Sequence, residues 1–175
     1  MALSKNQKAG AGAGLAVAGT ALLTMLSLDE GVRYTPYHDV AGVLTVCQGH
    51  TGSDIVPGKV YTKKECDALL IKNVTEHGAG VLRCTKVPLN QNQYDAFVRF
   101  TYNVGTSAYC HSALLKKLNS GDYVGACDAL MGWNKARVNG VLRPVKGLTN
   151  RRASERAQCL TPVSPAKPVS SQGVA

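Results

Sequence analysis

The chain has 175 residues, of which 45% are hydrophobic and 18% are charged. This composition suffices for the core of one domain, and it excludes a wholly disordered chain and a multi-span membrane protein. Twenty Lys and Arg residues against 11 Asp and Glu give a formal net charge of +9. Such a charge favours anionic partners, which include nucleic acid, anionic lipid and cell-wall glycan, but it does not choose among them.

The N-terminal region contains a charge-free run of 20 residues, from position 9 to position 28. As a helix it would be about 30 Å long, which matches the hydrocarbon core of a bilayer. Four glycines and six alanines make it only weakly apolar, so its insertion would be marginal. Lys5 and Lys8 precede the run, and this predicts that the rest of the chain lies outside the cytoplasm.

Two other interpretations of this run remain open. A cleaved signal peptide needs a small-residue cleavage site, and Ala16-Val17-Ala18 is a candidate in the middle of the apolar run. A helix buried in a folded domain fits the second half of the run and the two acids after it, residues 20–30.

Residues 29–160 are expected to form the folded body, in an α+β class with one small sheet followed by several helices. Short β-like runs between glycines predict strands within residues 33–60. Thr62 and Glu65 form a capping box, which predicts a helix start. Further helices are predicted at 90–103, 112–120, 122–133 and 149–160, with Val124, Cys127, Ala129 and Leu130 facing inward in the third. Residues 161–175, with three prolines and three serines, are expected to be disordered.

Six cysteines are dispersed along the chain, and none has the spacing of zinc ligands, so we expect no metal site. An even number of dispersed cysteines indicates disulfides in an oxidising compartment, with buried cytosolic thiols as the alternative. Six cysteines allow fifteen pairings, and their spacing does not choose among these.

Three polar residues near the end of the charge-free run, Glu30, Asp39 and Thr45, are of the types that glycoside hydrolysis requires. One carboxyl group must give a proton to the leaving oxygen, while a second must stay ionised to act on water or to stabilise the oxocarbenium-like transition state. Glu30 ends an apolar helix, where desolvation favours its protonated form, and Asp39 lies in a polar turn. The Thr45 hydroxyl can hold the attacking water. Taken alone, this spacing also fits a solvated acid, a turn aspartate and a strand threonine.

The surrounding motifs are more specific. The runs 29–33, 37–39 and 49–52 resemble the active-site segment of the phage-type lysozymes, family 24 of the glycoside hydrolases. The runs 89–96, 102–105 and 149–156, together with Trp133, resemble the helices of that family's larger lobe. The resemblance therefore extends over residues 27–160, with several motifs in register.

This resemblance implies a bilobal α+β fold, with a small β-sheet lobe and a larger helical lobe. It implies hydrolysis of the β-1,4 bond between N-acetylmuramic acid and N-acetylglucosamine in peptidoglycan, with no cofactor. In the family the glutamate is the general acid, the aspartate orients or activates water and the threonine helps to position it, with inversion at the anomeric carbon. These roles fall on Glu30, Asp39 and Thr45. His50 and Asn103 match cleft positions, where Asn103 is expected to line the sugar site and His50 to bind substrate or, alternatively, to hold the small sheet.

The charge-free run resembles the anchor of a subset of this family, the signal-arrest-release endolysins of phages that infect Gram-negative bacteria. The subset implies a monomeric enzyme that is tethered, inactive, to the host inner membrane facing the periplasm, and is then released into the periplasm to lyse the cell. The chain then divides into an anchor or first helix (residues 1–28), a catalytic domain (29–160) and a tail (161–175). Residues 20–28 would have two environments, the membrane or the protein core beneath Glu30.

Some members of the subset block the active site with a cysteine in the anchor. No cysteine precedes Cys47 in this chain, so the disulfides are expected to be structural. We expect three bridges, each joining neighbouring elements: Cys47–Cys66, Cys84–Cys110 and Cys127–Cys159.

Seven basic residues lie between positions 135 and 156. They predict a solvated basic face, with retention on anionic wall or membrane polymer as the alternative. Nucleic-acid binding is rejected because the region offers Trp133 as its single aromatic platform.

Three rival functions belong to other classes. A wall-binding protein without catalysis is disfavoured by intact Glu30, Asp39 and Thr45. A membrane-permeabilising protein would act through residues 9–28 and would not need Glu30. A lytic transglycosylase would not need the aspartate and threonine that handle water.

Overall fold

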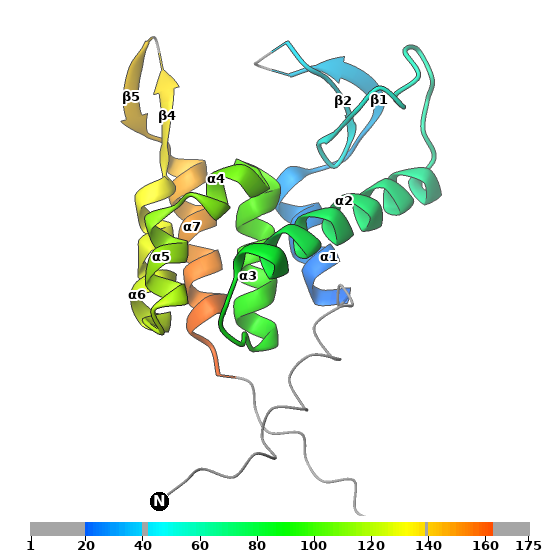
Figure 1. Cartoon of the computed structure of the whole chain (residues 1–175). Helices are drawn as coiled ribbons and strands as arrows, with labels where there is room; N and C mark the ends of the chain where they lie inside the picture. Colours follow the sequence, from blue (N-terminus) through cyan, green and yellow to red (C-terminus); the bar gives the residue numbers. More distant parts are fainter. Residues whose placement is uncertain (1–19, 40–41, 139, 163–175) are drawn as a thin grey trace, which may run out of the picture.

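The computed structural model describes residues 20–39, 42–138 and 140–162. The chain forms two lobes, in which a small antiparallel sheet stands apart from a helical bundle and is joined to it through α1 and α2 (Figure 1). The first helix and the strands of the β-lobe are α1 (Thr20–Glu30), β1 (Arg33–His38), β2 (Leu44–Cys47) and β3 (His50–Thr51). The remaining elements are α2 (Lys63–Cys84), α3 (Gln91–Val104), α4 (Thr106–Cys110), α5 (Ala113–Asn119), α6 (Tyr123–Ala129), the 3-10 helix η2 (Leu130–Trp133), β4 (Lys135–Val138), β5 (Val141–Pro144) and α7 (Lys146–Leu160).

The β-lobe is a three-stranded sheet in the order β1-β2-β3. Thr45 in β2 lies opposite Tyr37 in β1 and Thr51 in β3, so β2 is the central strand. Glycine at position 49, with φ +81°, makes the tight turn from β2 to β3, in a backbone region that other residues rarely adopt. The strands predicted within residues 33–60 are confirmed.

Side-chain caps set the starts of the main helices. Thr62 and Glu65 form the predicted capping box of α2, and Ser112 accepts a hydrogen bond from the Leu115 backbone N–H at the start of α5. The helix predicted from residue 90 begins at Gln91 as α3, capped by Asn90, and ends before Gly105.

The core lies around α3, which packs against α2 and α7. Its residues Phe97, Val98 and Phe100 are fully buried, and Phe100 meets Trp133 edge to face. Among the α1 side chains from residue 21 onward, Leu22 and Leu26 are the buried ones, and each contributes about 2–3 kcal/mol by leaving water. Leu28, two residues further along α1, is largely exposed.

All six cysteines form disulfides, and the predicted pairing is confirmed. Cys47–Cys66 joins β2 to α2, Cys84–Cys110 joins the end of α2 to α4, and Cys127–Cys159 joins α6 to α7. The bridges close loops of 19, 26 and 32 residues, and loops of this length are expected to contribute about 3 kcal/mol each through the unfolded state.

One helix prediction is wrong in part. The stretch 122–133 is broken into α6 and η2, and Val124 is 62% exposed rather than inward. Ala126 takes the buried position, beside Cys127 and its bridge to α7. The β4–β5 hairpin, which projects from the start of α7 (Figure 1), has no counterpart among the predicted elements.

The predicted anchor and the predicted disordered tail fall mainly on residues 1–19 and 163–175, which lie outside the described residues. Within the described ranges, no helix combines the length and the apolar character needed to cross a bilayer.

Candidate active site

Glu30 is the last residue of α1, where the helix gives way to β1. The Gly31 backbone N–H donates to the Ser27 carbonyl at 3.1 Å, and the positive φ of Gly31 turns the chain out of the helix. The Glu30 side chain is 21% exposed. Its Oε2 faces the β2–β3 turn, because a Cβ placed on Gly49 would lie 3.8 Å from that oxygen. The carboxyl group therefore lies between the helical bundle and the β-lobe.

Arg151 of α7 is the partner of Glu30. Its Nη1 donates to Glu30 Oε1 at 2.6 Å, and its Nη2 donates to the Asp29 carbonyl at 2.7 Å. The arginine is 14% exposed, so this ion pair is partly shielded from water. The basic run to which Arg151 belongs was expected to form a solvated face, and for two residues this expectation is wrong, because Arg151 is mostly shielded and Arg152 is fully buried.

Glu30 lines a hollow of about 500 Å³ between α1, α3 and α7. Asn103, an exposed residue of α3, lines the same hollow together with Arg151. The structure thus brings the predicted acid and the predicted sugar-site amide together. Burial raises the pKa of the neighbouring Tyr102 phenol, and the charge of Glu30 raises it further.

Asp39 and Thr45 are both hydrogen-bonded to the backbone of one residue of the β-lobe, Val43. The Val43 N–H donates to Asp39 Oδ1 at 2.9 Å, while the Val43 carbonyl accepts from the Thr45 hydroxyl at 2.9 Å. Thr45 is buried in the central strand and Asp39 is half-buried just after β1. Because the hydroxyl proton of Thr45 is used by Val43, its oxygen can only accept a hydrogen bond from a further group, as an attacking water would require.

His50 is buried, and both of its ring nitrogens have partners. Nδ1 lies 3.1 Å from Asn73 Oδ1 on α2, and Nε2 lies 2.9 Å from Asp54 Oδ1. The hydrogen bond from His50, with a second from Lys72, lowers the pKa of Asp54 to about 2. These contacts leave no ring nitrogen for a substrate, and they fit the alternative role of His50 in holding the small sheet to α2.

The two lobes are also joined beside the site. The Tyr102 hydroxyl of α3 donates to the Gln48 carbonyl at 2.7 Å, which fixes the β2–β3 turn against the helical bundle. Neither Tyr102 nor Arg151 was predicted as a functional residue. For both, the available sequence signal was their place within the motifs that resemble the helical lobe of the family.

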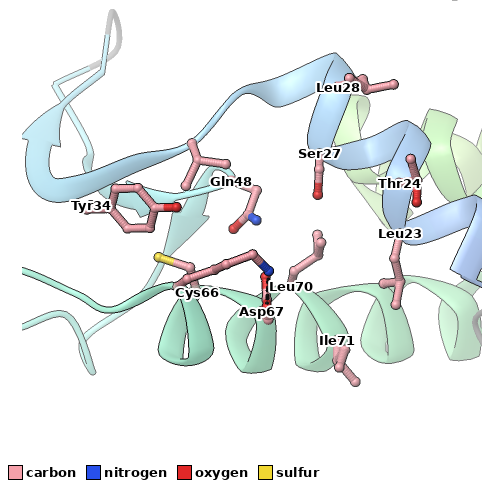
Figure 2. Close-up of a pocket in the computed structure, with 12 residues that line it drawn as sticks. Leu23, Thr24, Ser27, Leu28, Tyr34, Gln48, Cys66, Asp67, Leu70 and Ile71 are labelled. Carbon is pink, nitrogen blue, oxygen red and sulfur yellow. Dashed lines mark hydrogen bonds and ion pairs between the residues drawn. The ribbon is translucent and has the colours of Figure 1, made fainter.

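A second hollow, of about 510 Å³, lies between α1 and α2 (Figure 2). It is mostly apolar, and Ser27 and Gln48 point into it. Leu28 borders both hollows, so they lie on two sides of the end of α1. None of the predicted site residues lines the second hollow. Within the described part of the chain, no group of three His, Cys, Asp or Glu side chains is arranged to hold a metal ion.

Comparison with known proteins gives consistent matches. Residues 28–155 match the family model described as phage lysozyme. The SAR-endolysin of Bacteriophage PS119 is 49% identical over 131 residues, which are 75% of this chain and 76% of that protein. The SAR-endolysin of Escherichia phage Mu is 44% identical over 147 residues, 83% of each chain. Among solved structures, the muramidase domain of SpmX from Asticaccaulis excentricus matches with a TM-score of 0.77 and 32% identity, over 82% of this chain and 97% of that one.

Proposed function

The chain belongs to the phage lysozyme family, and from this premise we propose that Glu30, Asp39 and Thr45 carry out its reaction. The protein is an endolysin with lysozyme activity: it hydrolyses the β-1,4 bond between N-acetylmuramic acid and N-acetylglucosamine in the peptidoglycan of the bacterial host. The observation that supports Glu30 best is its position, half-buried between the lobes and facing a hollow that also contains an exposed amide.

Glu30 is the proton donor to the glycosidic oxygen. In the substrate-free protein its carboxyl group is held by Arg151, which compensates a negative charge. Donation requires the protonated carboxyl, so binding of the glycan must weaken this ion pair before the bond breaks. The desolvation that a bound sugar brings to a half-buried carboxyl favours the same change.

Asp39 and Thr45 handle the water. The water donates one hydrogen bond to the Thr45 oxygen and gives its other proton to the Asp39 carboxylate as its oxygen attacks the anomeric carbon. The leaving oxygen takes the proton of Glu30, so Asp39 and Glu30 exchange protonation states in each turnover. Attack from the face opposite the leaving group gives inversion. Asn103 binds a sugar substituent in the hollow, whereas His50 acts by holding the sheet that carries Thr45.

The chain works as a monomer, first on the host inner membrane and then free in the periplasm. This proposal rests on the SAR-endolysins among its relatives and on the composition of residues 9–28. The two environments exclude each other, because Leu22 and Leu26 lie in the protein core of the folded form. While α1 is in the membrane, Glu30 lacks its place between α3 and α7.

Mass spectrometry of the sugar ends that the full-length protein releases from purified peptidoglycan tests the reaction. Hydrolysis yields reducing N-acetylmuramic acid ends, which carry one water more than anhydro-muramic ends. Anhydro-muramic ends would instead indicate a lytic transglycosylase, and intact glycan strands would indicate a wall-binding protein. The product is read directly, so this result does not depend on how fast cells lyse.

A further inference from the structure

Two acidic residues, Asp29 and Glu30, end α1, and the last turn of this helix contains no basic residue. A carboxylate at the C-terminus of a helix faces the negative end of the helix dipole, so both groups require cations from other elements. Arg151 of α7 supplies one to Glu30. The other comes from Arg99, in the middle of α3, whose Nε and Nη2 donate to Asp29 Oδ2 at 3.1 and 2.8 Å.

The Arg99 guanidinium is 2% exposed, and each of its three nitrogens has a partner. On α7, Nη1 donates to Gln158 Oε1 at 2.8 Å and Nη2 donates to Ser154 Oγ at 3.2 Å. On α1, Nη1 also contacts Met25 Sδ at 3.6 Å. Burying an arginine costs least when its donors are satisfied and its charge is paired, and Arg99 meets both conditions.

The contacts of Arg99 join three helices at the point where Glu30 is held. Ser154 and Gln158 follow Arg151 by three and seven residues, so all three lie on one face of α7. That face therefore holds Glu30 directly through Arg151 and holds Asp29 through Arg99. The Asp29 residue is fixed twice, at its carboxylate by Arg99 and at its carbonyl by Arg151.

We infer that Arg99 is a positioning residue for the reaction, which fixes the backbone from which Glu30 projects. The inference rests on the proposed role of Glu30 as proton donor. The apolar contacts of α1 do not suffice for this purpose, because its buried leucines, Leu22 and Leu26, precede Glu30 by one turn or more. Arg151 does not suffice either, since its ion pair with Glu30 weakens when the acid is protonated and its hydrogen bond to the Asp29 carbonyl is then its one remaining contact at the helix end. The Arg99–Asp29 pair is independent of that proton and keeps the helix end in place throughout the turnover.

The test compares full-length variants on purified peptidoglycan, each at the same interval below its own midpoint of thermal unfolding. Arg99→Met keeps the length of the stem and removes the donors, and Asp29→Asn removes the paired charge with little change of shape. Both are expected to lower kcat by about 10- to 100-fold and to change KM by less than about twofold, because the acid is displaced while sugar contacts remain. The double variant is expected to be no worse than the poorer single variant. Arg99→Lys keeps the charge but not the two-pronged guanidinium, and its kcat is expected to lie between those of the parent and Arg99→Met.

Leu118→Ala serves as the matched control, since it removes a fully buried side chain from α5, a helix that lies apart from α1 in the bundle (Figure 1). It is expected to lower the thermal midpoint and to retain kcat. The inference is overturned if Asp29→Asn or Arg99→Met keeps kcat within about twofold of the parent, or if Leu118→Ala loses kcat as far as they do. Glu30→Gln in the same series separates the two claims: an active Glu30→Gln overturns the proposed function as well, whereas an inactive one beside a fully active Arg99→Met overturns the role of Arg99 alone.

Discussion

At the level of single residues, the chemistry of the site depends on the hydrogen-bond donors and acceptors that each polar side chain has left after its contacts within the protein. The Thr45 hydroxyl is buried and gives its proton to the Val43 carbonyl, so it meets a further group only as an acceptor. The same Val43 unit holds the Asp39 carboxylate. The two side chains proposed to act on water are thus both held by the backbone of Val43 in the β-lobe, while the proposed proton donor is held in the helical lobe.

Replacing Thr45 by valine tests this arrangement, because valine keeps the shape of the side chain and removes the acceptor. We expect kcat to fall by about 10- to 100-fold with little change in KM, since a water-positioning contact is made mainly on the way to the transition state. Serine at this position is expected to recover much of the rate. The kinetics are measured on soluble glycan fragments.

Thr51→Val is the matched control, because Thr51 lies opposite Thr45 in the sheet but is exposed. It is expected to retain the parent rate. Equal rates for Thr45→Val and the parent would remove Thr45 from the mechanism.

At the scale of elements, α7 is held by charged residues within the helical lobe. Arg152 and Glu155 are fully buried and pair at 2.7 Å, and Arg152 also stacks over the Phe100 ring. Within the described structure, Arg152 Nε, Arg152 Nη1 and Glu155 Oε2 have no hydrogen-bond partner. The pair therefore does not fully recover the cost of its own desolvation. Burial raises the pKa of Glu155 from 4.5 to about 7, against the opposing effect of Arg152.

Because the pKa of Glu155 is raised in the folded protein, the free energy of unfolding is expected to depend on pH. Near pH 4.5 and below, Glu155 is largely protonated in the folded protein and the raised pKa contributes its full stabilisation. As the pH rises from 4.5 to about 7, the unfolded chain loses the proton while the folded protein keeps it, so this contribution falls by up to about 1.4 kcal/mol per pH unit. Glu155→Gln removes this titration. The free energy of unfolding of the parent, measured in urea relative to the variant, should therefore fall across this range.

The two stability curves are compared at several pH values from 4.5 to 7.5. A constant difference between parent and variant would mean that Glu155 is ionised in the folded protein over the whole range. In that case Arg152, rather than burial, would control its charge.

The elements that could be predicted from the sequence are those with local signals. The capping box at Thr62 and the serine at position 112 mark helix starts, because each cap bonds a residue three positions further along the chain. The sequence of the β4–β5 hairpin also contains such a signal, since Asn139-Gly140 is the dipeptide typical of a two-residue hairpin turn. The Val124 error arose because helical spacing in a short segment does not fix which face meets a neighbour.

The predicted site is incomplete for a different reason. Glu30, Asp39, Thr45 and Asn103 lie in motifs that can be recognised along the chain. Arg151 and Arg99 act through partners that are 121 and 70 residues away, so no local pattern identifies their contacts. Their roles depend on the packing of α7 and α3 against the end of α1, which only the folded structure defines.

For the whole molecule, the proposed regulation depends on one segment that can lie either in the membrane or in the folded protein. Residues 20–28 are the second half of the charge-free run and also most of α1, the helix that ends at Glu30. Under this proposal, Glu30 cannot reach its place between α3, α7 and the Gly49 turn unless this segment leaves the membrane. The weakly apolar composition of residues 9–28 is what makes departure feasible.

Replacing Gly10, Gly12, Gly14 and Gly19 by leucine should hold the protein in the membrane. Each leucine adds apolar surface that favours the bilayer, whereas the folded domain from Thr20 onward is unchanged. We expect the variant to stay in the membrane fraction after the membrane potential is collapsed, and lysis of the host to be strongly delayed. Cell fractionation and culture turbidity measure the two effects.

Alanine at the same four positions is the control, because alanine adds little apolar transfer free energy. That variant is expected to be released. Normal lysis timing by the leucine variant would contradict the tethering proposal while leaving the enzymatic reaction untouched.

If the Glu30 carboxyl group donates the proton that breaks the glycan strand, its replacement by an amide must stop cleavage, so the decisive measurement is the rate of bond cleavage by Glu30→Gln. The amide keeps the shape of the side chain and cannot donate a carboxylic proton. With purified full-length proteins and peptidoglycan, we expect cleavage by Glu30→Gln to fall by at least about a thousandfold, while Glu76→Gln, an exposed glutamate on α2, cleaves at the parent rate. Cleavage by a folded Glu30→Gln at a rate close to that of the parent would contradict the account.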